Sequence, residues 1–122
     1  MIKRILLTAA LALTLVGSAD AQTKGPNGGI VVKADDHPIE LVLRGQEIVF
    51  YVSDHDGKPF ATKGVQARAV VQNKGKATNV TLAPAEPNMF VGKLTAVIGS
   101  KARIVFSARM HDHTLQARFV TD

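Results

Sequence analysis

The chain has 122 residues and a formal net charge of +5, with one Tyr, no Trp and no Cys. The lack of Cys excludes disulfides, thiolate metal sites and cysteine nucleophiles. The excess of positive charge is modest and no Arg-rich run is present, so the composition does not favour a nucleic-acid-binding protein.

Residues 1–21 have the three parts of a secretory signal peptide. Lys3 and Arg4 form a basic start, an apolar run extends from Ile5 to Val16, and small residues precede the expected cleavage site after Ala21. A membrane anchor is the alternative interpretation, but the run is shorter than the roughly 20 residues that a spanning helix needs. We therefore expect the chain to be exported, with no membrane span after cleavage.

The mature chain would contain 122 − 21 = 101 residues, which is the size of one domain. Its first residues, 22–28, include Gly and Pro, and we expect a loose N-terminal arm there. The domain itself would then comprise residues 29–122.

Alternation of apolar and polar residues predicts an all-β domain, because no stretch keeps a helical spacing of apolar residues for three turns. Gly, Asn, Asp and Pro separate eight expected strands, near 29–33, 38–44, 47–53, 64–72, 76–82, 89–95, 101–109 and 114–121. Short strands at this spacing favour a single antiparallel β-sandwich. The apolar phase of the strands predicts a core of Leu41, Leu43, Ile48, Phe50, Val52, Ile104, Phe106, Leu115 and Phe119.

In an antiparallel domain each connection reverses the chain, so alternate loops lie at the same end. The connections at 34–37, 54–63, 83–88 and 110–113 would share one end. They hold all four histidines of the chain and six acids, whereas the connections at 45–46, 73–75 and 96–100 hold neither His nor acid. The acids at the first end are Asp35, Asp36, Asp54, Asp56, Glu86 and Asp112. The sequence thus predicts one end rich in histidine and carboxylate.

Imidazole and carboxylate groups suit Zn or Cu(II), and a thioether would add affinity for Cu(I). We therefore treat this end as a candidate copper or zinc site, with the candidate ligands His111, His113, His55, His37, Asp112 and Met110. A two-residue turn at Asp112-His113 would need positive φ at both positions, where Gly is the better residue. The alternative is an ordinary set of exposed polar loops.

Two other kinds of site have less support. The segment "DHDGKP" (54–59) offers oxygens for Ca²⁺ but lacks the further acids and the terminal Glu of a calcium loop, so an Asp-Gly turn is the better interpretation. Ser53 beside His55 has no specified base or oxyanion hole, and no cofactor motif occurs, so we do not expect an enzyme.

Four stretches resemble small periplasmic domains of proteobacteria: "GPNGGIVV" (25–32), "HPIELVL" (37–43), "VFYVSDHDGKPFATKG" (49–64) and "VTLAPAEPN" (80–88). Such domains occur alone and beside heavy-metal efflux adaptors of the resistance-nodulation-division type. The resemblance implies an immunoglobulin-like sandwich and a metal-efflux or other envelope protein as partner. "MHDH" (110–113) departs from the Asp-Gly turn usual at this hairpin.

Two functions follow from these expectations. One is a periplasmic accessory that binds or hands over a metal ion. The other is a structural or interaction module without metal that contacts another envelope protein. Neither the metal nor the oligomeric state follows from the sequence.

The signal peptide gives the first testable prediction. Mass spectrometry of a periplasmic extract should detect a mature chain that begins at Gln22, because the small residues end at Ala21. A chain that keeps Met1 in the membrane fraction would instead identify residues 1–21 as an anchor.

Overall fold

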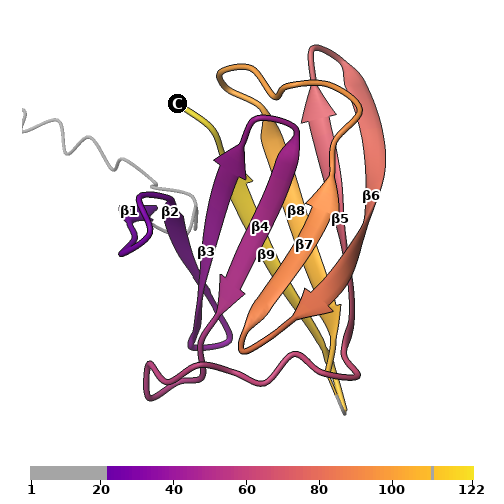
Figure 1. The fold of residues 1–122 in the computed structure, drawn as a ribbon. Helices are drawn as coiled ribbons and strands as arrows, with labels where there is room; N and C mark the ends of the chain where they lie inside the picture. The colour runs from indigo at the N-terminus through magenta and orange to yellow at the C-terminus, as the bar shows by residue number, and fades with distance from the viewer. Residues whose placement is uncertain (1–21, 111) are drawn as a thin grey trace, which may run out of the picture.

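The computed structural model describes residues 22–110 and 112–122, and these residues form nine β-strands (Figure 1). The predicted signal peptide lies outside the described residues. The strands are β1 (Thr23–Lys24), β2 (Ile30–Ala34), β3 (His37–Arg44), β4 (Glu47–Val52), β5 (Gln66–Asn73), β6 (Lys76–Ala85), β7 (Met89–Lys93), β8 (Arg103–Arg109) and β9 (Thr114–Val120). Every strand pair is antiparallel, which confirms the prediction of an all-β, antiparallel fold.

The strands form one curled sheet in the order β1-β2-β3-β4-β7-β6-β5-β8-β9. The long strand β6 joins its two halves, because residues 76–82 pair with β5 and residues 83–85 pair with β7. The curl brings β2 against β9, and β3, β4 and β7 cross over β8 and β9 in Figure 1. The two halves therefore face each other as the layers of the expected sandwich would, but β6 connects them edge to edge.

Aromatic side chains fill the space between the halves. The ring of Phe50 on β4 lies 4.6 Å from that of Phe106 on β8 and 5.7 Å from that of Phe119 on β9, measured between centroids. Phe90 on β7 completes the cluster at 5.7 Å from Phe106. Eight of the nine predicted core residues are buried, and the ninth, Leu43, is partly buried against them. The predicted phase of the strands is therefore confirmed.

The eight expected strands correspond to β2–β9, and the structure adds a strand in the segment predicted to be a loose arm. Thr23 and Lys24 pair with β2, and the side-chain amide of Gln22 is bonded to both backbone groups of Val120 on β9. Residues 22–24 thus extend one edge of the curled sheet and also contact β9, the strand at its other edge.

A buried carboxylate holds the turn between β1 and β2. Glu40 is only 4% exposed, and its Oε2 accepts hydrogen bonds from the backbone N–H groups of Asn27 and Gly29, each at 2.9 Å. The side-chain amide of Asn27 donates a third bond at 2.8 Å. A Cβ on Gly25 would lie 2.4 Å from the Glu40 carboxyl, and one on Gly29 would lie 2.1 Å from the carbonyl oxygen of Leu41. The "GPNGG" stretch is therefore shaped by close backbone approach to β3.

The connections after β2, β4, β6 and β8 lie together at the lower end of the molecule in Figure 1. Those after β3, β5 and β7 lie at the other end, as does the C-terminus. The predicted division of the loops between two ends is confirmed, because strictly antiparallel pairing holds throughout this strand order. Within the described residues, no helix has the length and apolar character needed to cross a membrane.

Glu40 should contribute strongly to stability. Glu40→Ala removes the acceptor of three hydrogen bonds and leaves two backbone N–H groups without a carboxylate partner. The free energy of unfolding, measured in urea, should therefore fall by about 3 kcal/mol or more. The matched control is Glu47→Ala on the adjacent strand β4, which should change stability by about 0.5 kcal/mol or less. Equal losses in the two variants would show that the buried carboxylate has no special role.

Candidate functional site

The β2–β3 turn places two acids at the histidine-rich end in a conformation that few residues adopt. Ala34 pairs with His37, and the two residues between them have positive φ, 47° at Asp35 and 63° at Asp36. Asp tolerates this left-handed region better than most residues with a side chain, although Gly fits it best. The two-residue turn with positive φ at both positions thus occurs at Asp35-Asp36.

The β8–β9 turn contacts the β2–β3 turn at this end. The Nδ1 atom of His113 lies 2.7 Å from Oδ1 of Asp112, and its Nε2 lies 3.8 Å from Oδ2 of Asp35. Because an ionised carboxylate can only accept, the ring donates its Nδ1 proton to Asp112. When the ring is neutral, its Nε2 is therefore the acceptor nitrogen, and it lies near the Asp35 carboxylate.

His37 has the same arrangement of ring nitrogens. It begins β3, is half-buried, and its Nδ1 lies 2.9 Å from the carbonyl oxygen of Ser53. A carbonyl carries no proton, so Nδ1–H is the donor and Nε2 is left as the acceptor of the neutral ring. The ring of Phe60 contacts His37 edge to face, with 5.9 Å between centroids, and fixes its orientation further.

His55 lies beside His37 in the long connection between β4 and β5. The two imidazoles are 6.3 Å apart between centroids and nearly perpendicular. His55 is exposed, and its Nε2 lies 4.0 Å from Oδ2 of Asp56. The described part of this end therefore contains two pairs, Asp35 with His113 and His37 with His55, and residues 35–37 link them along the chain.

The structure does not bring all six predicted ligands together. His111 lies outside the described residues. Met110 packs its side chain against the hydrophobic core, and its backbone N–H donates to the carbonyl of His113 at 2.8 Å. Across residues 22–110 and 112–122, no group of three or more His, Asp or Glu side chains is arranged to hold a metal ion.

The "DHDGKP" segment uses its first acid to form a turn. Oδ1 of Asp54 accepts hydrogen bonds from the backbone N–H groups of Asp56 and Lys58, both at 2.9 Å. Gly57 follows with φ of 82°, and Asp54 N–H closes the loop onto the carbonyl of Lys58 at 2.7 Å. These contacts support the interpretation of this segment as an Asp-Gly turn.

Sequence reasoning did not select Asp35 as a candidate ligand, although it placed this acid at the correct end. The available signal was the "DD" pair in the short connection predicted at 34–37. That Asp35 rather than Asp36 faces His113 depends on the turn conformation and on the curl of the sheet, which brings β2 against β9.

Comparison with known proteins adds no relative, since the chain matches no family model, no curated protein and no solved structure. The site must therefore be judged on its own geometry.

The ring nitrogens of His37 give a direct test of that geometry. Proton-detected ¹⁵N spectroscopy at about pH 8, where an ordinary imidazole is neutral, should show the proton of His37 on Nδ1. The exposed His55 serves as the internal control and should exchange between its two tautomers. A His37 ring with its proton on Nε2 would contradict the hydrogen bond to Ser53.

Proposed function

We propose that this protein is an exported periplasmic β-domain that binds a divalent copper or zinc ion at its histidine-rich end. The observation that carries the proposal is the contact of 3.8 Å between Nε2 of His113 and Oδ2 of Asp35, which belong to different turns. An exposed pair of this kind suits an accessory that holds an ion briefly and hands it on.

The distances are compatible with a shared ion. Two ligands of a tetrahedral zinc ion, each bonded at about 2.0–2.1 Å, lie about 3.3 Å apart. The separation of 3.8 Å would need only a small shift of two side chains that are 47% and 67% exposed. His111, two residues from His113, is the nearest candidate in the sequence for a third ligand.

Asp112 would stabilise this site by its hydrogen bond to the ligand His113. Its carboxylate accepts a hydrogen bond from Nδ1–H of His113 and so leaves Nε2 as the nitrogen with the free lone pair in the neutral ring. Metal-binding histidines commonly have such a carboxylate or carbonyl partner, which fixes the tautomer and raises ligand basicity. The Ser53 carbonyl gives His37 the same arrangement, so His37 and His55 are candidates for a second, neighbouring position along a transfer route.

The resemblance to domains found beside heavy-metal efflux adaptors supports a role in metal handling, with an efflux protein as the recipient. The alternative is an interaction module without metal. Binding measurements on the purified protein separate the two functions.

Calorimetry with Zn²⁺ and with Cu²⁺ should detect one site of modest affinity. Replacing a ligand should lower the affinity, so His113→Ala and Asp35→Asn should each weaken binding by about tenfold or more. The control is Asp36→Asn in the same turn, which removes the same charge and should bind like the parent. Affinity should fall on acidification, because a protonated imidazole cannot ligate.

The His111→Ala/His113→Ala double variant decides the role of the β8–β9 turn. It should lose the binding that the parent shows. Equal affinity in parent and double variant would leave 110–113 an ordinary polar turn with the metal bound elsewhere, and no binding to either protein would favour the interaction module. Equal losses in Asp35→Asn and Asp36→Asn would show a general effect of charge in place of ligation.

A further inference from the structure

The half of the sheet formed by β5, β6, β8 and β9 has an outer surface with an unusual charge. These four strands contain no Asp or Glu. Their buried positions alternate with outward positions, and four arginines occupy outward, exposed positions. We call this surface the arginine face and define it by Arg68 on β5, Arg103 and Arg109 on β8, and Arg118 on β9.

The four guanidinium groups are available for a partner. None of them forms an ion pair with any carboxylate among the residues that the structure describes. Val70 and Val105 lie among these arginines and are only partly exposed. The remaining outward positions of β5, β8 and β9 are mainly Gln, Ser and Thr. A planar guanidinium matches a carboxylate with two parallel hydrogen bonds, so this surface is complementary to carboxylate-bearing ligands.

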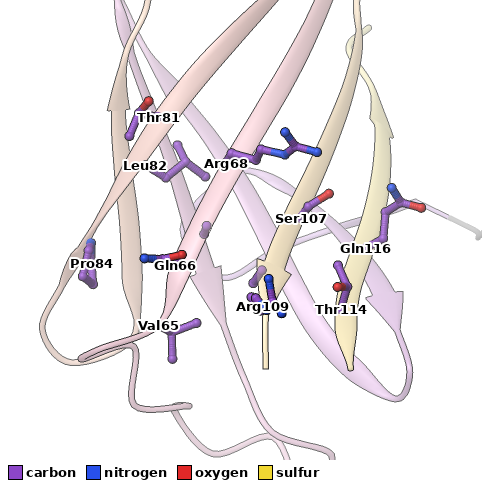
Figure 2. Close-up of a pocket in the computed structure, with 12 residues that line it drawn as sticks. Val65, Gln66, Arg68, Thr81, Leu82, Pro84, Ser107, Arg109, Thr114 and Gln116 are labelled. Carbon is purple, nitrogen blue, oxygen red and sulfur yellow. The ribbon is translucent and has the colours of Figure 1, made fainter. Parts of the chain in front are cut away.

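The end of this face nearest to the histidine-rich turns is hollowed into a groove of about 650 Å³. Arg68 and Arg109 line it, together with Gln66, Ser107 and Gln116, as Figure 2 shows. A primary amide both donates and accepts hydrogen bonds, as a peptide backbone requires of its partner. The groove therefore combines two cations with groups that can bond to a main chain.

The strand register sets the spacing of the two cations. Gln66 lies opposite Arg109, and Arg68 lies opposite Ser107, so Arg68 and Arg109 are diagonal neighbours on adjacent strands. Diagonal neighbours in an antiparallel pair are about 7–8 Å apart. Side chains on one face of an extended peptide recur every second residue, about 7 Å apart. Acids at alternate positions of an extended peptide would thus meet Arg68 and Arg109 together.

We propose that the groove around Arg68 and Arg109 binds an extended acidic segment of another protein, with Asp or Glu at alternate positions. This site uses none of the proposed metal ligands, and the proposal does not rest on metal binding. The exposed large hydrophobic residues of the described chain are Val97 and Val120, and neither lines the groove, so nothing here favours insertion into a lipid surface.

The test uses a synthetic peptide of about ten residues with alternating Glu and Thr, and the same peptide with Gln in place of Glu. The acidic peptide should bind the parent, with an affinity that falls as salt is raised, and the Gln peptide should not. Arg68→Gln/Arg109→Gln should weaken binding by about tenfold or more. The control, Lys33→Gln/Lys93→Gln, removes the same charge from exposed positions on β2 and β7 and should weaken it by less than about twofold.

Backbone amide shifts locate the site independently of the variants. Addition of the acidic peptide should shift Gln66, Ser107 and Gln116 more than residues of β2 and β3. Equal weakening in the arginine and lysine variants, or equal binding of the two peptides, would overturn the proposal.

Other ligands are tested on the same variants. Tighter binding of an acidic polysaccharide or of anionic lipid vesicles, lost in Arg68→Gln/Arg109→Gln, would assign the groove to that class and overturn the proposal. Self-association in sedimentation that the same variant abolishes would identify a second copy of the chain as the occupant, and would overturn it equally.

Discussion

Strict antiparallel pairing is the constraint on which the arrangement of this protein depends. Each strand reverses the direction of the one before it, so the connections must alternate between the two ends of the sheet. His37, His55, His113 and six of the acids lie in or beside one alternate set of connections, and they meet at one end although up to about 80 residues separate them along the chain. The contact between Asp35 and His113 is a direct result, because it joins the second strand's turn to the last one.

The alternation of side chains along each strand separates apolar residues, which face the core, from polar residues, which face outward. One phase supplies the aromatic and aliphatic core, and the other phase faces outward. On β5, β8 and β9 that outward phase includes four arginines and no acid, so this face of the sheet carries a local excess of positive charge. Charge is therefore unevenly distributed: six of the acids lie in connections at one end, and four arginines lie on the sheet face beside them.

The features that the sequence could predict are those set by these two periodicities. The strand phases, most of the core and the end at which each loop lies all follow from alternation and parity. Glu40 shows what alternation cannot reveal. It occupies an ordinary strand position, and its burial depends on the N–H groups of Asn27 and Gly29, which only tertiary contact brings to it.

Two further features depend on the strand order, which the sequence does not contain. The short strand β1 forms because Glu40 fixes the turn that follows it, and because Gln22 is hydrogen-bonded to the backbone of Val120 across the curl of the sheet. The diagonal pair of Arg68 and Arg109 exists because β5 lies beside β8, a strand that follows it by more than 30 positions in the chain. Both arginines could be assigned to an outward phase, but their proximity could not be predicted.

The two proposed sites are close enough to influence each other. Arg109 and Thr114 line the groove, and they flank the turn that contains Asp112 and His113. A cation held by His113 and Asp35 would offset carboxylate charge that otherwise repels an acidic segment approaching the groove. Thermodynamic linkage makes this effect reciprocal: the acidic segment in the groove would raise the affinity for the metal by the same factor by which the metal raises the affinity for the segment. A protein with both sites would therefore bind its partner more tightly when loaded with metal, and release of the partner would favour release of the ion.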